Sequence, residues 1–262
     1  MCLIFLLVDQ HPKYKLIVAA NRDEFYGRKT EAATFWEDHP QILGGRDLEA
    51  RKPDGTCGTW MGVNKNGRIA MVTNYRDLKN LKQQAPSRGH LVTDFLITDV
   101  PPEKYLKSIE PRAKEYNGFN LIVGTAEELY YLSNYRDGVS KIEKGLHGLS
   151  NALLDTPWPK VKNGKERMKQ LFSENKIDPQ IILDSLYDEH QAADNLLPDT
   201  GVGLERERML SSMFIKSPNY GSRCSTFVTI TYDNQVEFVE RVYDLKTFNY
   251  KQQAFQFAVT QN

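Results

Sequence analysis

The sequence predicts an α+β fold in which two stacked antiparallel sheets carry helices on their outer faces. Apolar runs of strand length occupy both ends of the chain, and two helical segments lie between groups of strands. Each helical segment consists of two consecutive helices, whereas a parallel sheet would alternate single helices with strands. We expect one domain spanning residues 1–262, since strand-rich chains of this length often share one core.

The predicted strands begin with two hairpins. Residues 3–8 and 14–20 are apolar runs joined by a turn-like segment, and they should pair. Residues 59–63 and 68–73 flank Asn64-Lys-Asn-Gly67, whose Asn-Gly pair suits a turn with positive φ. Further strands are predicted at residues 119–123, 129–132, 224–232, 236–242 and 255–259.

The predicted helices form two consecutive pairs. Residues 87–115 contain the first pair, divided by two prolines, with Ser87 placed to cap its first helix. The second pair covers residues 160–174 and 179–188. Asp178 caps the last of these helices, because a proline at the first helical position follows it.

Charge and hydropathy exclude several classes of partner. Lys+Arg and Asp+Glu both number 34, so the formal net charge is zero, which argues against binding nucleic acid or an anionic membrane by electrostatics. No apolar stretch approaches the roughly 18 residues of a membrane span. The apolar run at residues 3–8 lacks the basic flank and cleavage site of a signal peptide. We therefore expect a cytoplasmic protein whose partners are small molecules.

The cysteines and histidines predict neither a disulfide framework nor a metal site. Cys2, Cys57 and Cys224 are an odd number at wide spacing, which fits a reducing compartment. We expect Cys57 and Cys224 to be buried thiols without a catalytic role. The five histidines are dispersed, and no nucleotide-binding glycine motif occurs, so no metal or cofactor is expected.

Cys2 directly follows Met1 and opens the first predicted strand. Methionine is normally removed when the next side chain is small, which would place a thiol and an α-amine on the same residue. An N-terminal nucleophile uses this arrangement, because the amine takes the proton while the thiolate attacks a carbonyl. Their ordinary pKa values, near ~7.8 and ~8.5, suit that exchange. The alternative is a small buried residue at the start of a strand.

A polar cluster, Asn21-Arg22-Asp23-Glu24, follows the second predicted strand. In a hairpin whose first strand begins at Cys2, the end of the second strand lies beside that beginning. We therefore expect Arg22 to lower the pKa of the Cys2 thiol and Asp23 to hold the amine or Arg22 in place. The alternative is a solvated turn with a salt bridge that contributes at most about 1 kcal/mol.

These residues resemble the NRDE family, which includes the transport and Golgi organisation protein 2 type. The resemblance implies an N-terminal-nucleophile hydrolase type of fold with four layers, αββα. More distantly, the chain is similar to cysteine amidases that act on bile salts, penicillin V and acyl amides. Besides Met1-Cys2 and Asn21–Glu24, the matching blocks are Gly45–Asp47, Gly58–Val63, Thr73–Arg76, Gly118–Leu121, Gly148–Asn151, Asp155–Lys160 and Tyr220–Thr226.

The resemblance also implies roles for individual residues. Cys2 corresponds to the nucleophile, and Arg22 to the arginine at the end of the second strand. Asp23 corresponds to the aspartate that follows, although it comes directly after Arg22 whereas those amidases usually place it three residues on. Turnover would then require that Met1 is removed, because a retained Met1 leaves Cys2 without an amine.

Three later residues complete the implied site. Asn151 resembles the asparagine whose amide stabilises the oxyanion, with Asn74 as a second candidate, and such a donor contributes about 3 kcal/mol. Arg223 resembles a late arginine that organises the site. The alternatives are that Asn74 and Asn151 are turn residues at strand ends and that Arg223 pairs with a carboxylate.

Two functions are consistent with this sequence. The first is hydrolysis of a linear amide, a carbon–nitrogen bond in a small acylated substrate, by an N-terminal cysteine. The second is non-catalytic binding or trafficking of haem or of an acyl lipid such as acyl-CoA on the same fold. The state of Met1 discriminates between them.

Overall fold

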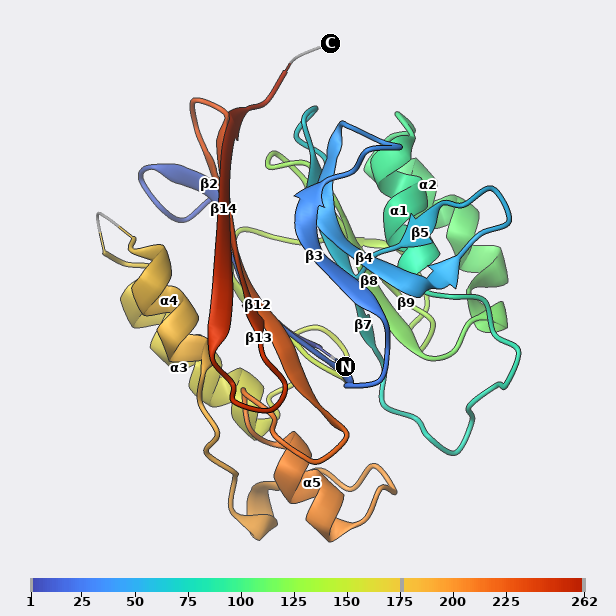
Figure 1. Cartoon of the computed structure of the whole chain (residues 1–262), viewed down its shortest axis with the longest axis vertical. Helices are drawn as coiled ribbons and strands as arrows, with labels where there is room; N and C mark the ends of the chain where they lie inside the picture. The colour runs from blue at the N-terminus through green and yellow to red at the C-terminus, as the bar shows by residue number, and fades with distance from the viewer. Residues whose placement is uncertain (1, 175–176, 261–262) are drawn as a thin grey trace. The chain divides into compact units, whose positions relative to one another are not determined.

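The computed structural model describes residues 2–174 and 177–260, so the state of Met1 lies outside the described residues. The chain divides into two compact units, each with one sheet (Figure 1). The first unit comprises residues 1–27, 76–79 and 144–256, and the second comprises residues 28–75, 80–143 and 257–262. Cys2 and the cluster at residues 21–24 belong to the first unit.

The first unit contains a six-stranded sheet in the order β11-β1-β2-β12-β13-β14. Its central strands pair antiparallel, and β2 lies between β1 and β12. A register shift on β12 between Ser222 and Cys224 marks a bulge opposite the end of β2. The strands are β1 (Cys2–Val8), β2 (Tyr14–Phe25), β11 (Gly145–Leu149), β12 (Tyr220–Thr231), β13 (Gln235–Tyr243) and β14 (Tyr250–Ala258).

Helices α3 (Pro159–Leu171) and α4 (Pro179–Leu186) cover one face of this sheet (Figure 1). Leu3 and Phe5 of β1 share a buried core with Val161 of α3. A Cβ atom on Gly164 would lie 2.1 Å from the Phe5 ring, so glycine is what lets α3 approach β1. The approach brings the first turn of α3 to the beginning of β1. A short helix, α5 (Leu204–Leu210), precedes β12.

The second unit contains an eight-stranded sheet in the order β10-β9-β8-β7-β6-β4-β3, with β5 paired to β4. Helices α1 (Gly89–Ile97) and α2 (Pro102–Ile109) and the 3-10 helix η1 (Glu110–Glu115) pack on it through a separate apolar core. The strands are β3 (Thr30–Phe35), β4 (Ile42–Arg51), β5 (Cys57–Gly58), β6 (Met61–Asn64), β7 (Ile69–Asn74), β8 (Phe119–Gly124), β9 (Leu129–Ser133) and β10 (Ser140–Lys141).

The predicted α+β class, with two antiparallel sheets that carry helix pairs, is confirmed. Each sheet with its helices accounts for two of the four expected layers. Both predicted hairpins form, and Gly67 takes the positive φ of 78° that its turn requires. Asp178 caps α4 by accepting a hydrogen bond from the Gln180 N–H.

Several predicted boundaries were wrong. Strands β3 and β4 were not expected, because Gly44-Gly45 interrupts the apolar pattern of β4. A Cβ on Gly44 would lie 2.7 Å from the Met61 carbonyl oxygen, so close packing between strands requires glycine there. Arg88, not Ser87, is the N-cap of α1, and Ser87 Oγ instead accepts a hydrogen bond from the Gly89 N–H at 3.3 Å. The strand starts predicted at residues 224 and 255 were late, since β12 begins at Tyr220 and β14 at Tyr250.

Candidate functional site

The strand register places Cys2 beside Arg22. Cys2 pairs with Arg22 across β1 and β2, and Cys224 pairs with Arg22 from the other side, on β12. Both cysteines are buried thiols, as is Cys57 in the second unit. The prediction that Arg22 lies beside Cys2 is confirmed. The prediction that the second strand ends before Asn21 was wrong, because β2 continues to Phe25 and the cluster lies within it.

A residue that follows β11 forms a hydrogen bond with the beginning of β1. Ser150 Oγ donates a hydrogen bond to the Cys2 carbonyl oxygen at 3.2 Å and lies 3.1 Å from Asn151 Oδ1. The Asn151 carbonyl oxygen accepts a 2.7 Å hydrogen bond from the Arg76 N–H. Through Ser150, Asn151 and Arg76 are thus held in the neighbourhood of Cys2.

The carboxylates near Cys2 have different environments. Ser222 Oγ donates a 2.6 Å hydrogen bond to Asp23 Oδ1, whereas Arg22 Nη2 lies 3.8 Å from Glu24. Burial raises the pKa of Asp23 above its ordinary range. Burial also raises the pKa of the Cys2 thiol, and Asp23 adds to that rise while Arg22 opposes it. Cys2 therefore rests as a neutral thiol near pH 7, and nucleophilic attack by it requires a base.

Lys160, which the sequence argument did not assign to the site, is a buried cation beside this group. Its exposed fraction is 3%. Burial lowers its pKa to about 8, the charge of Asp23 opposes that change, and the charge of Arg76 adds to it. A sequence signal for it exists, because Lys160 is the second residue of α3, where the helix dipole disfavours a cation.

Arg76 was also missed, and it forms a buried ion pair. Its Nη1 lies 2.7 Å from Glu207 Oε2, and its guanidinium carbon lies 4.6 Å from the centre of the Trp158 ring. The other Glu207 oxygen, Oε1, accepts hydrogen bonds from the Thr200 N–H and hydroxyl at 2.8 and 2.6 Å. Burial lowers the pKa of Arg76, which Glu207 counteracts. Glu207 gave no signal in the sequence, since only the packing of α5 brings it here.

The two remaining predicted residues, Arg223 and Asn74, lie at a β-bulge and at the end of a strand, respectively. Arg223 occupies the bulge on β12, and its Nη1 donates a 2.9 Å hydrogen bond to the Phe25 carbonyl oxygen. Asn74 ends β7 in the second unit, where it pairs with Phe119. Their roles, like those of Arg22, Asp23 and Asn151, stay predictions.

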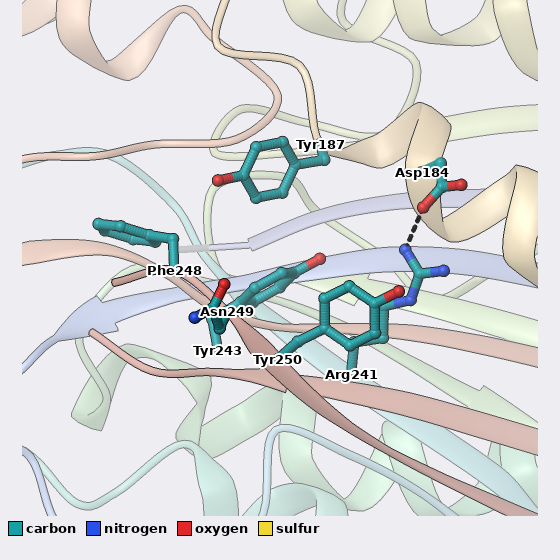
Figure 2. A pocket seen from close by; sticks show the side chains of 7 residues that line it. All are labelled: Asp184, Tyr187, Arg241, Tyr243, Phe248, Asn249 and Tyr250. Carbon is teal, nitrogen blue, oxygen red and sulfur yellow. Dashed lines mark hydrogen bonds and ion pairs between the residues drawn. The ribbon is translucent and has the colours of Figure 1, made fainter. Parts of the chain in front are cut away.

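A second polar and aromatic region of the first unit lines an open pocket of about 590 Å³ (Figure 2). Arg241 is ion-paired with Asp184, and its guanidinium carbon lies 4.3 Å from the centre of the Tyr250 ring. The volume is in the range of roughly 300–1,000 Å³ that is typical of small-molecule sites. The lining residues are Asp184, Tyr187, Arg241, Tyr243, Phe248, Asn249 and Tyr250.

Neither a metal cluster nor a membrane-spanning helix is present in the described parts of the chain. Within residues 2–174 and 177–260, no group of three His, Cys, Asp or Glu side chains is arranged to hold a metal ion. No helix in the same residues is long and apolar enough to cross a membrane.

The fold and this geometry define an α+β protein of two antiparallel sheets with a cysteine-centred polar cluster at one strand end. The chain belongs to the Transport and Golgi organisation 2 family, whose sequence model matches residues 1–245. The resemblance derived from the sequence blocks is thereby confirmed.

The relatives cover nearly the whole chain. The Transport and Golgi organization protein 2 homolog of Homo sapiens is 38% identical over 259 residues, and that of Bos taurus is 36% identical over 264, each covering 92% of both chains. A solved structure of a mutant conjugated bile acid hydrolase from Clostridium perfringens covers 100% of this chain and 98% of its own, with 10% identity and a TM-score of 0.43.

Proposed function

We propose that the protein is an N-terminal cysteine hydrolase that cleaves a linear amide in a small acylated substrate. The observation that carries the proposal is the pairing of Cys2 with Arg22 at the strand end where Ser150 bonds the Cys2 carbonyl oxygen and lies beside Asn151. A cysteine at this place has a cation on the adjacent strand and an amide side chain nearby. These are the groups that acyl transfer to a thiol needs.

The reaction begins when Met1 has been removed and the α-amine of Cys2 takes the thiol proton. The thiolate attacks the carbonyl carbon, and the electron pair of the C=O bond moves to the oxygen. In this reaction Asn151 is the amide donor that stabilises the oxyanion through Nδ2, and its Oδ1 lies 3.1 Å from the Ser150 hydroxyl. Collapse breaks the carbon–nitrogen bond, and the amine leaves with the proton. Water then cleaves the thioester, which releases the acid and restores the thiol.

The neighbouring residues hold the nucleophile in place. Arg22 stabilises the Cys2 thiolate, whose pKa burial otherwise raises. Asp23, fixed by Ser222, orients the α-amine. A reducing, cytoplasmic location suits this chemistry, since Cys2 must remain a thiol.

The test compares three forms of the protein purified from its native host. The intact mass reports whether Met1 is absent, and a panel of acyl amides is then assayed for release of amine. We expect loss of Met1, turnover by the wild type, and no turnover by Cys2→Ala. Cys224→Ala removes a buried thiol from the same sheet and should retain turnover. A retained Met1, or unchanged turnover in Cys2→Ala, would refute the proposal.

The second candidate, non-catalytic binding of haem or acyl-CoA, is favoured by the pocket of Figure 2. Aromatic rings from Tyr187, Tyr243, Phe248 and Tyr250 surround it, and such rings stack on planar groups like a porphyrin or an adenine. Titration with haem or palmitoyl-CoA should quench tyrosine fluorescence, and Tyr250→Ala should weaken that response. Absence of any spectral change or binding heat with both ligands would exclude this candidate.

A further inference from the structure

Three side chains near Cys2 have buried donors that make no hydrogen bond within residues 2–174 and 177–260. They are Arg76 with Nε and Nη2, Lys160 with Nζ, and Tyr220 with its hydroxyl. None of these atoms has a hydrogen-bond partner among the residues that the structure describes. A buried donor without a partner costs about 1–3 kcal/mol, so four in one region indicate an acceptor from outside the chain.

The backbone places the three side chains around the same strand ends. Arg76 is bonded through its N–H to Asn151, the neighbour of the residue that bonds the Cys2 carbonyl. Lys160 lies in the first turn of α3, which the Phe5–Gly164 contact brings to the start of β1. Tyr220 opens β12 and pairs with Phe25 at the end of β2, three residues after Arg22.

Electrostatic effects within the group agree with this placement. Arg76 and Tyr220 perturb each other, and both respond to the charge of Asp23. Lys160 responds to Asp23, Arg76 and Cys2. The three donors therefore lie around one region that also contains the Cys2 thiol.

The donors of Arg76 identify the shape of the acceptor. Nη1 is engaged by Glu207, whereas Nε and Nη2 form the side edge of the guanidinium. Two parallel N–H groups on one edge match the two oxygens of a carboxylate. A carboxylate has about four lone-pair sites, which matches the four donors of Arg76, Lys160 and Tyr220.

We propose that Arg76, Lys160 and Tyr220 form a subsite that binds a carboxylate group of a ligand beside Cys2. Arg76 binds it through two parallel hydrogen bonds, and Lys160 and Tyr220 occupy the remaining lone pairs. The positive end of the α3 dipole adds to the attraction. If the protein is the amidase proposed above, the subsite selects acyl amides that carry a carboxylate close to the scissile bond. Only this statement about the substrate rests on the proposed function.

The test measures anion binding in the absence of turnover. The Cys2→Ala protein is titrated with sodium acetate, acetamide and inorganic phosphate at constant ionic strength, and arginine Nε–H resonances are followed by NMR. We expect saturable binding of acetate, at least about tenfold weaker binding of neutral acetamide, and no preference for phosphate over acetate.

Variants in the same background locate the site. Lys160→Met and Tyr220→Phe should each weaken acetate binding, by about tenfold and about threefold, respectively. Lys162→Met changes an exposed lysine of the same helix and should leave the affinity unchanged. Tyr220→Phe removes one hydroxyl and decides the test if Lys160→Met does not fold.

Equal binding of acetate and acetamide, tighter binding of phosphate, or unchanged affinity in both variants would overturn the subsite. These results do not depend on catalysis. Acetate binding without amide turnover by the wild type would contradict the amidase and support the carboxylate subsite. Amide turnover without acetate binding would support the amidase and contradict the subsite.

Discussion

Arg76 and Arg241 are two buried arginines of the first unit that differ in how their donors are used. Each side chain is only 2% exposed, and each is ion-paired to a carboxylate. Arg241 also donates through Nε to Gln252 and through Nη2 to Gln180, so every nitrogen has a partner. Arg76 is bonded to Glu207 through Nη1, whereas its Nε and Nη2 make no hydrogen bond among the residues that the structure describes.

The number of hydrogen-bonded donors on each guanidinium indicates which arginine stabilises the fold. A buried guanidinium that serves packing should have all its donors satisfied, since an unsatisfied donor reduces stability. Arg241 meets that rule and links β13 to α4 and β14. Arg76 departs from it beside Cys2, where a ligand supplies the missing acceptors.

The largest expected effect concerns the partners of the two arginines. Glu207 is 4% exposed, so Glu207→Gln leaves Arg76 as a buried cation without a counter-charge and should lower the free energy of unfolding by about 3 kcal/mol. Asp184 is 68% exposed, so Asp184→Asn should cost less than about 1 kcal/mol. Urea denaturation measures both. Equal losses would mean that the two ion pairs serve the same structural purpose.

The second prediction concerns the pH dependence that Lys160 imposes. Its pKa falls from an ordinary 10.5 to about 8 on folding, so the unfolded chain binds more protons between those values. Wild-type stability should therefore gain from this group as the pH rises from 8 to 10.5, and the penalty should be complete below pH 8.

Lys160→Met removes that penalty and should stabilise the protein by about 3 kcal/mol at pH 7. The difference between variant and wild type should shrink as the pH approaches 10.5. Urea denaturation at a series of pH values measures it, with Lys162→Met as the exposed control. A constant difference across the series would show that Lys160 is not a buried cation.

The smallest expected effect compares two tyrosine hydroxyls. Tyr243 shares a 3.0 Å hydrogen bond with Ser225, so Tyr243→Phe should cost about 1 kcal/mol of unfolding free energy. The Tyr220 hydroxyl is buried and makes no hydrogen bond within the described part of the chain, so Tyr220→Phe should be neutral or slightly stabilising in the unliganded protein. Thermal denaturation in acetate-free buffer measures the stability change of both variants. A loss in Tyr220→Phe as large as that in Tyr243→Phe would mean that Tyr220 serves the fold.

The sequence predicted the parts of the site that depend on local order. Cys2 meets Arg22 because a hairpin with a short turn fixes the register of its two strands. The blocks at residues 148–151 and 155–160 indicated that Asn151 and its surroundings matter. The cap at Asp178 followed from the preferences of aspartate and proline at a helix start, and α3 begins one residue before the predicted residue 160.

The parts of the site and fold that were not predicted depend on contacts between segments distant in the chain. A single sequence does not encode such contacts in a local pattern. Glu207 reaches Arg76 across 131 positions of the chain. Lys160 becomes part of the site only because Gly164 allows α3 to approach Phe5. Strand β4 was not predicted because its glycines have low strand propensity and are present for close packing between strands.

The central claim, that Cys2 is the nucleophile, is tested most directly by locating the acyl group on the protein. The wild type is mixed with p-nitrophenyl butyrate, an activated acyl ester, and quenched in acid, and its peptides are examined by tandem mass spectrometry. We predict a butyryl group on Cys2 of a chain that lacks Met1. An unlabelled Cys2, or a butyryl group on Cys224 instead, would contradict it.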